Sequence, residues 1–172
     1  MPITLRPARA EDAQAMCDLL NPIIAEGTTT AHRTAFDPES MVAHYIAPVR
    51  GVSCVTAWDG ARLMGFQALE WPDPDWTGWG AVPGDWRLIA SFVAAGAQGR
   101  GIGQALFAAT REAAREAGLV AIDATIRADN VPGLAYYGKL GFADYDRVTG
   151  VPLSDGTPVD RVRKVYRLVP DT

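Results

Sequence analysis

A glycine-rich segment, QGRGIG at residues 98–103, is the part of the sequence best suited to bind an anion. It lies between an apolar stretch that favours a buried strand and a segment with the spacing of an amphipathic helix. The start of a helix presents unpaired N–H groups at the positive end of its dipole. Glycines 99, 101 and 103 carry no side chain, so the backbone can approach a ligand closely. The segment therefore predicts a cradle for a diphosphate group, to which Arg100 could add a charged contact.

Two other phosphate-binding loops do not fit this spacing. A Walker A loop requires Gly-Lys followed by Ser or Thr, whereas Gly101 is followed by Ile102 and Gly103. The dinucleotide-binding pattern G-x-G-x-x-G would require a third glycine at Gln104 or Leu106. A tight strand-to-helix turn without a ligand remains the alternative.

The periodicity around this segment predicts strands and helices in alternation. Asp59-Gly60 separates two apolar runs and is typical of a hairpin turn. We expect strands at 3–7, 52–58, 62–70, 88–94, 119–126, 142–148 and 159–168, and helices at 11–27, from Pro38, at 102–118 and at 132–140. This order predicts an α/β (α+β) fold, with a mixed central sheet and helices on both faces. We expect residues 1–172 to form a single domain, since this length fits one hydrophobic core.

The charge of the chain argues against one class of function. A formal net charge of −4 is unusual for a nucleic-acid-binding protein, which generally carries a basic face, so we expect no nucleic-acid partner. Basic residues cluster only near the C-terminus, at Arg161, Arg163, Lys164 and Arg167. They alternate with apolar residues, which predicts the solvent face of a strand.

The cysteines and the apolar stretches exclude other classes. Cys17 and Cys54 are too few for a disulfide framework, and their apolar neighbours predict buried packing residues. No C-x-x-C spacing occurs, and we expect no metal. The N-terminal segment lacks the apolar run of a signal peptide, and no stretch approaches the length of a membrane span. We therefore expect a cytoplasmic protein without a membrane partner.

Two blocks of the sequence together resemble the GNAT superfamily of N-acetyltransferases. The segment Gln98-x-x-Gly101-x-Gly103, after LIASFVA, looks like the family's acetyl-CoA loop. The block NVPGLAYYGKLGF resembles its downstream pattern, with Asn130 first and then Tyr137 and Gly-Phe at 141–142. The early stretch at 19–36 resembles the phosphinothricin acetyltransferase-like branch, whose members acetylate small amino-acid-like amines.

The resemblance implies how acetyl-CoA would bind. It implies a mostly antiparallel sheet in which the strand ending at Val93 splays from its neighbour at 119–126. The pantetheine arm would lie in that gap and pair with the backbone near Phe92 and Val93, where an N–H group would polarise the thioester carbonyl. Asn130 would hold the arm, although its other role is that of a helix N-cap. The contacts with the pyrophosphate would come from Gln98, Gly99, Arg100, Gly101, Ile102 and Gly103.

The family spacing makes Tyr137 the candidate general acid, because a phenol can protonate the departing thiolate. Its alternative role is that of a core tyrosine that packs the helix. The adjacent Tyr136 points elsewhere on a helix and is expected to serve as the control for substitutions of Tyr137.

The general base is less clear from the sequence. Relatives of the phosphinothricin type often carry a Glu in the strand before the loop, but the matching position is Leu88. We therefore expect Glu70, at the end of the preceding strand, to act as the catalytic base, with Asp85 as a further candidate. A chain of water molecules is the alternative.

Three residues are candidates for binding the acceptor. Arg33 could pair with an acceptor carboxylate, and Trp76 and Trp79 could form an apolar lid or part of a dimer interface. The alternatives are a solvated arginine and a loop fixed by its own aromatic residues. His32 lies in the same segment as Arg33, and we expect His44 to be a surface residue.

The sequence thus predicts an acetyl-CoA-dependent N-acetyltransferase of a small primary amine, such as an amino acid or an analogue. By resemblance, transfer is direct in a ternary complex and the enzyme is a homodimer. An acceptor that is a protein or peptide amine or a polyamine is the alternative, as is a non-catalytic acyl-CoA sensor.

Overall fold

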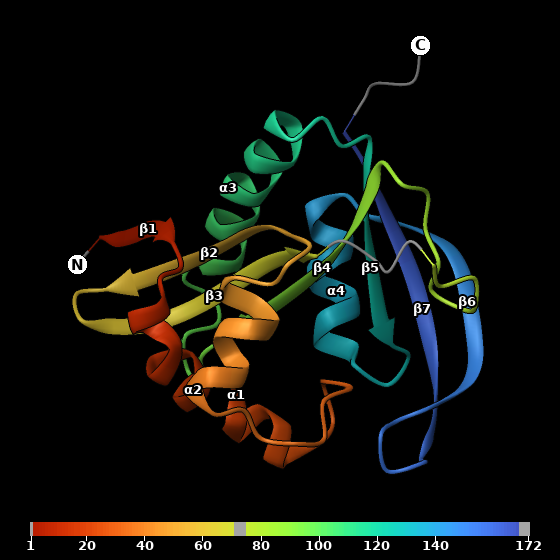
Figure 1. Cartoon of the computed structure of the whole chain (residues 1–172), viewed down its shortest axis with the longest axis horizontal. Coiled ribbons are helices and arrows are strands. Elements are labelled where there is room, and N and C mark those ends of the chain that lie inside the picture. The colour runs from red at the N-terminus through yellow and green to blue at the C-terminus, as the bar shows by residue number, and fades with distance from the viewer. Residues whose placement is uncertain (1, 71–74, 169–172) are drawn as a thin grey trace.

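The computed structural model describes residues 2–70 and 75–168. Its strands form one seven-stranded sheet (Figure 1). The strands are β1 (Ile3–Pro7), β2 (Gly51–Asp59), β3 (Arg62–Glu70), β4 (Trp86–Val93), β5 (Ala121–Arg127), β6 (Ala143–Pro152) and β7 (Pro158–Arg167). They are ordered β1-β2-β3-β4-β5-β7-β6, and only β4 and β5 are parallel. The prediction of a mixed, mostly antiparallel sheet is confirmed.

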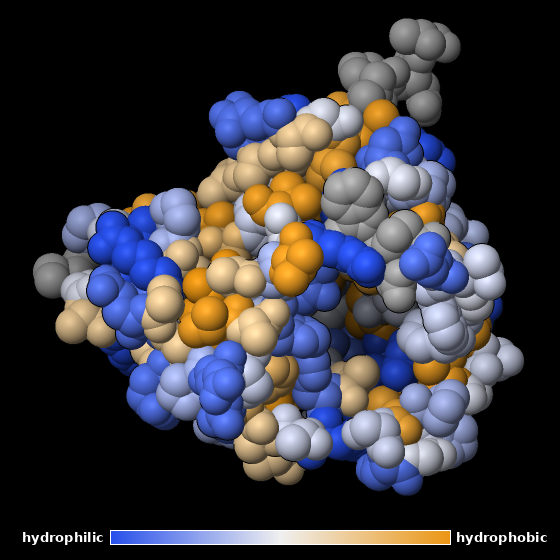
Figure 2. Space-filling model, in the orientation of Figure 1, coloured by the Kyte–Doolittle hydropathy of each residue, from blue (hydrophilic) through white to orange (hydrophobic). Residues whose placement is uncertain are grey.

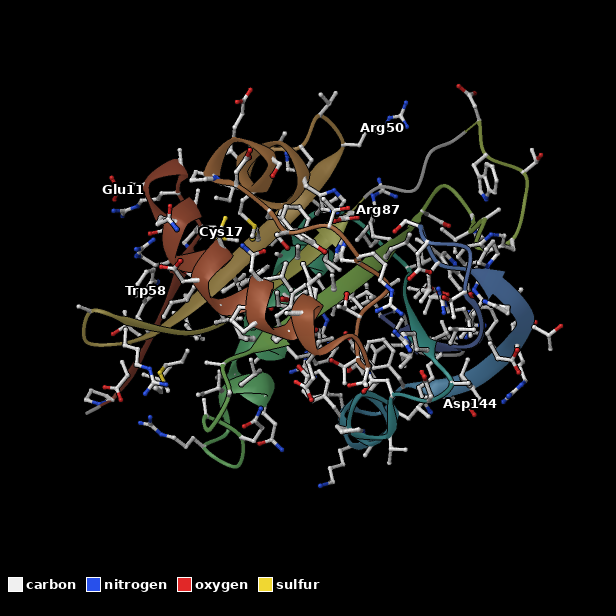
Figure 3. The ribbon with its side chains drawn as sticks, turned by 90° about the horizontal axis from the view of Figure 1, so that it is seen from below. Glu11, Cys17, Arg50, Trp58, Arg87 and Asp144 are labelled. Carbon is white, nitrogen blue, oxygen red and sulfur yellow. The ribbon has the colours of Figure 1, made fainter. Side chains whose placement is uncertain are left out.

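Helices cover both faces of this sheet, as predicted. They are α1 (Ala13–Glu26), α2 (Pro38–Met41), α3 (Ile102–Glu116) and α4 (Val131–Leu140), with a short 3₁₀ helix, η1 (Ala10–Asp12), and a short π-helix, η2 (Val42–Ile46). Adjacent residues of a strand point to opposite faces, so Leu63 packs with α1 and Met64 with α3. Figure 3 shows α1 and α2 on one side of the sheet and α3 and α4 on the other.

The element boundaries agree closely with the sequence periodicity, apart from the C-terminal hairpin. Strand β6 continues to Pro152 and β7 begins at Pro158, so the connection is much shorter than the loop expected at 149–158. Residues 75–85, which include Trp76 and Trp79, contain no helix or strand. Cys17 and Cys54 are both buried in the core, and Cys17 is labelled in Figure 3.

The prediction of a solvent face at the C-terminal basic cluster is wrong for two of its members. Arg161 and Arg163 are only 4% and 5% exposed. Arg163 pairs with the buried Asp123 beneath the ring of Tyr145, and Arg161 lines a cavity described below. The alternation of basic and apolar residues did not reveal that Arg161 and Arg163 are buried, because both faces of β7 are covered in this region. Arg167, at the end of the strand, is exposed.

Candidate active site

A cavity of about 220 Å³ opens where β4 and β5 separate. The two strands pair only at three positions, from Trp86↔Ala121 to Leu88↔Asp123, and diverge beyond them. Figure 2 shows the hollow on this face of the molecule, with hydrophilic residues inside it. Its lining comes from the loop after α1, η2, β4, β5, α4 with its N-cap, and β7: Thr29, Thr30, Ala31, His32, Tyr45, Ile89, Ala90, Ser91, Phe92, Thr125, Ile126, Arg127, Asn130, Gly133, Tyr136, Tyr137 and Arg161.

The end of β4 presents backbone groups to this gap. The N–H of Ala94 donates to Met64 O of β3 at 2.8 Å, so it points away from β5. Because N–H groups alternate along a strand, those of Val93 and Ser91 point toward the gap. Phe92 instead faces α1 and places its side chain in the cavity. The gap therefore offers backbone from Val93 and an aromatic side chain from Phe92.

The glycine-rich segment leads into the uncapped start of α3. Gly99 and Gly101 have φ values of +83° and +75°, a region that glycine adopts without strain. The N-cap, Gly101, makes no side-chain hydrogen bond, whereas Asp37 and Asn130 cap α2 and α4. The first N–H groups of α3 therefore remain open to a ligand.

The side chains of this segment divide between the surface and the core. Gln98 and Gly99 are exposed, and Ile102 is buried in the core, so Ile102 offers a ligand only its backbone. Arg100 pairs with Asp59 of β2 at 3.1 Å and is 42% exposed. The charge of Arg100 is thus shared with a carboxylate of the neighbouring hairpin.

Tyr137 ends a chain of buried hydrogen bonds that also reaches the glycine-rich segment. Its hydroxyl lies 2.8 Å from Ser91 Oγ. Gln67 Nε2 donates both to Ser91 Oγ at 2.8 Å and to Tyr136 Oη at 3.0 Å, and Tyr136 Oη donates to Gly103 O at 2.7 Å. Tyr136 also lines the cavity, so it is not the neutral control that the sequence predicted.

Burial keeps both phenols protonated. It raises the pKa of Tyr137 well above its usual value, although the Ser91 hydrogen bond opposes the shift. It raises the pKa of Tyr136 to about 12. The hydroxyl of Tyr137 therefore carries its proton at neutral pH.

Asn130 acts as a helix cap and also joins two distant segments. Its Oδ1 accepts from Gly133 N at 3.0 Å, which is the capping bond predicted as its alternative role. Its Nδ2 donates to Thr29 O at 3.1 Å. The side chain thus fixes the loop after α1 against the start of α4, at the wall of the cavity.

Glu70 lies beside the cavity but does not line it. It is the cross-strand partner of Leu88, the position at which the resembling enzymes carry a Glu. Its Oε1 is buried without a hydrogen bond from any described residue and lies 3.5 Å from His44 Nε2. Burial raises the pKa of Glu70 to about 7. A carboxylate thus occupies the neighbouring strand, on the same face of the sheet.

Two histidines lie between Glu70 and the cavity wall. The rings of His44 and His32 contact edge to face, 5.4 Å apart, and His32 Nε2 lies 2.6 Å from Tyr45 Oη in the cavity wall. Burial lowers the pKa of His44, and burial together with His44 lowers that of His32 to about 4. His44 is 45% exposed, in agreement with the surface position that we expected.

Three predicted acceptor residues lie outside the cavity. Arg33 Nη1 donates to Gly27 O at 3.0 Å, and its Nε lies 3.3 Å from Asp155, so its charge is already paired. Trp76 and Trp79 are 52% and 46% exposed, and Trp76 Nε1 donates to Trp79 O. The structure does not bring these three residues to the cavity.

Two arginines that the sequence did not single out for the site line the cavity instead. Arg127 and Arg161 are opposite each other in the register of β5 and β7 and are 7% and 4% exposed. The sequence feature that could have indicated a site residue was the position of Arg127, which ends an apolar strand three residues before Asn130.

Neither a metal site nor a membrane helix is found in the part of the chain that the structure describes. No group of three or more His, Cys, Asp or Glu side chains could hold a metal ion there. No helix in residues 2–70 and 75–168 is long and apolar enough to cross a membrane.

The comparisons with known proteins agree with this geometry. Residues 15–142, more than half of the chain, match the acetyltransferase (GNAT) family. The chain therefore belongs to this family, and it is an N-acetyltransferase with acetyl-CoA as co-substrate. No curated protein is significantly similar in sequence.

Solved structures share the fold at low sequence identity. The structure of yncA from Salmonella typhimurium with its cofactor acetyl-CoA matches at a TM-score of 0.81 and 18% identity, covering 99% of this chain and 96% of that one. A candidate phosphinothricin N-acetyltransferase matches at a TM-score of 0.77 and 22% identity, covering 98% of this chain and 100% of that one. A ribosomal-protein-alanine N-acetyltransferase from Brucella melitensis matches at a TM-score of 0.79 and 21% identity, covering 95% of this chain and 99% of that one. Several branches of the family are thus similar to a comparable degree.

Proposed function

We propose that this enzyme transfers the acetyl group of acetyl-CoA directly to a small primary amine, an amino acid or an analogue, in a ternary complex. The observation that carries the proposal is the cavity at the divergence of β4 and β5, with the hydroxyl of Tyr137 in its wall. A cavity of about 220 Å³ fits a small acceptor better than a folded protein surface. The phosphinothricin acetyltransferase-like branch, with its amino-acid-like acceptors, is one analogy that supports this choice of acceptor.

The donor would bind along the edge of β4. The open N–H groups at the start of α3 receive the pyrophosphate, with Gln98, Gly99, Arg100 and the backbone of Ile102 around it. The pantetheine arm replaces β5 as the neighbour of β4 beyond Leu88, where Phe92 and Val93 contact it and Asn130 borders the other wall. The N–H of Val93 then points at the thioester carbonyl and stabilises the oxyanion of the tetrahedral intermediate.

Two side chains, Tyr137 and Glu70, are the candidates for the acid and the base of the reaction. The neutral hydroxyl of Tyr137 donates its proton to the sulfur of CoA as the C–S bond breaks. Glu70 accepts the proton that the amine loses, relayed by water, because the carboxylate itself does not line the cavity. A pKa of about 7 suits Glu70 to a base at neutral pH, since about half of the carboxylate is ionised there.

Release of CoA thiol tests this function directly. Acetyl-CoA would be mixed with the enzyme and a panel of amino acids, methionine sulfone, phosphinothricin, polyamines and peptides. We expect turnover of a small amino acid or analogue and a much lower rate with Tyr137→Phe. Turnover of only peptides or polyamines would point to the alternative acceptors. Tight binding of acetyl-CoA without turnover of any amine would favour a non-catalytic sensor.

The assembly and the compartment are further parts of the proposal. A homodimer in the cytoplasm is the state expected from the sequence. Size-exclusion chromatography with light scattering would measure the mass in solution, and a value of one chain, about 18.4 kDa, would contradict the dimer.

A further inference from the structure

The wall of the cavity formed by β5 and β7 carries two buried positive charges side by side. Arg127 and Arg161 form a cross-strand pair, and like charges at opposed positions of a sheet destabilise it. Both are more than nine-tenths buried, so water does little to screen their repulsion. Such a pair requires a compensating negative charge.

Arg127 has protein partners for its charge and its hydrogen bonds. Its Nε and Nη2 donate to Asp129 at 3.0 and 2.8 Å, and its Nη1 donates to Gly27 O and Thr30 O, both at 3.0 Å. These bonds hold the loop after α1 against β5. The charge of Arg127 is therefore compensated within the protein, and its role in the pair is to hold this loop.

Arg161 lacks an anionic partner among the residues that the structure describes. Its one hydrogen bond there is a long one, 3.3 Å from Nη1 to Val159 O. Burial and the charge of Arg127 lower the pKa of Arg161, and Asp129 opposes this only in part.

The neighbouring carboxylates are engaged elsewhere. Asp160 binds Arg147, and Asp123 binds Arg163. Asp155 pairs with Arg33. The described lining of the cavity contains no Asp or Glu side chain. The free donors of Arg161 thus border a space that holds no protein anion.

We propose that Arg161 binds a carboxylate of the acceptor, so that this enzyme selects amines that also carry an acid group. The inference rests on the proposed function, because it places the acceptor in the same cavity as Tyr137. A guanidinium pairs with a carboxylate through two parallel hydrogen bonds, which fixes the direction of the acceptor as well as its charge. The same wall repels polyamines, which carry only positive charge.

Binding of product analogues tests the proposal without relying on turnover. The full chain, with and without CoA, would be titrated calorimetrically with the N-acetyl derivatives of the twenty amino acids and with their C-terminal amides. We expect at least one acid to bind about 10- to 100-fold more tightly than its amide, the range of a hydrogen-bonded charge. The result that no acid binds better than its amide would overturn the proposal.

Three variants locate the effect. Arg161→Gln should weaken binding of the acid to the level of the amide and change binding of the amide less than threefold. Arg161→Lys, which keeps the charge, should retain part of the preference. Arg167→Gln, an exposed residue on the same strand, is the matched control and should keep the full preference. An unchanged preference in Arg161→Gln, or an equal loss for acid and amide, would contradict the assignment.

Titration with acetyl-CoA separates this inference from the proposed function. If acetyl-CoA fails to bind the wild type, the proposed function fails, while the comparison of acid with amide still decides whether Arg161 binds carboxylates. If acetyl-CoA binds equally to the wild type and to Arg161→Gln, the donor site is independent of the arginine, as expected.

Discussion

The hydroxyl of Tyr136 donates a hydrogen bond to the backbone oxygen of Gly103, and its ring occupies the space that a side chain at Gly103 would need. A Cβ atom built on Gly103 would lie 2.5 Å from a ring carbon of Tyr136. Helix α4 therefore sets the position of the first turn of α3, where the donor's pyrophosphate is proposed to bind. The third glycine of the segment serves packing rather than a special backbone angle.

Substitution of Gly103 by Ala should therefore weaken binding of acetyl-CoA. The methyl group must displace Tyr136 or the start of α3, and overpacking of this kind costs about 1–3 kcal/mol of stability. We expect acetyl-CoA to bind about 10-fold more weakly, as measured by calorimetry. Gly138→Ala in α4 is the matched control, because its Cβ would meet nothing within 4 Å and alanine favours a helix by about 0.5–1 kcal/mol. Equal binding by both variants would show that the contact does not shape the site.

Removal of the two phenol hydroxyls should have different kinetic effects. Tyr137→Phe removes the proposed acid, so we expect kcat to fall about 10- to 1000-fold with little change in KM for acetyl-CoA. Tyr136→Phe leaves Gln67 with one acceptor fewer and frees Gly103 O, which should raise KM for acetyl-CoA and reduce stability by about 1–2 kcal/mol. Steady-state kinetics of both variants would separate these roles. A similar loss of kcat in both would argue against Tyr137 as the acid.

The activity should depend on the ionisation of Glu70. With a pKa of about 7, the base form of Glu70 accumulates as pH rises, so kcat/KM should increase between about pH 6 and 8. Glu70→Gln should lower kcat/KM and abolish this dependence, as measured by pH profiles of both proteins. A profile in Glu70→Gln identical to that of the wild type would exclude Glu70 as the base.

The ionisation of Glu70 should also change the free energy of unfolding, in a direction that its raised pKa determines. Its pKa in the folded chain is raised above the unfolded value, so the folded state holds the proton more tightly. This contribution favours the folded state at low pH and is lost as pH rises from about 4.5 to about 7. The lowered pKa values of His32 and His44 act in the opposite direction below about pH 6.5. Denaturant unfolding of Glu70→Gln against wild type at several pH values isolates Glu70, and the variant should gain relative stability as pH rises.

The two buried arginines of β7 should respond differently to the same substitution. Arg163 compensates Asp123, which is fully buried, so Arg163→Met should destabilise the fold by about 3–5 kcal/mol. Arg161 has no such partner, so Arg161→Met should leave the free energy of unfolding unchanged or raise it. Urea unfolding at pH 7 measures both. A large loss in Arg161→Met would show that its charge is needed for folding.

The order of elements was largely predictable from the sequence, whereas the donor site stays a prediction. Periodicity, turn residues and two short motifs report local structure, and residues 98–103 and Asn130 carry their signal within a few neighbours. Tyr137 was predicted from family spacing, and the structure places it in the cavity wall. Its catalytic role and that of Glu70 stay predictions.

The acceptor side was less predictable because it is built from contacts between distant segments. Arg33 looked like an anchor for a carboxylate, but Asp155, over 100 residues later, pairs with it. Arg161 looked solvent-exposed because valines alternate with it, yet the register of β5 and β7 turns it toward the cavity. Neither relationship is visible without knowing which strands are neighbours.

The loop after α1 accepts hydrogen bonds from the opposite half of the molecule through three of its peptide oxygens. Arg127 binds the oxygens of Gly27 and Thr30, and Asn130 binds that of Thr29. Every amino acid supplies such an oxygen, so these hydrogen bonds place no demand on the side chains of Thr29 and Thr30, whereas the φ of +79° at Gly27 favours glycine. Exchange of Thr29 or Ala31 would change the lining of the cavity while the loop stays in place. Single substitutions here would thus change the acceptor side of the proposed site without altering the start of α3, where the donor is proposed to bind.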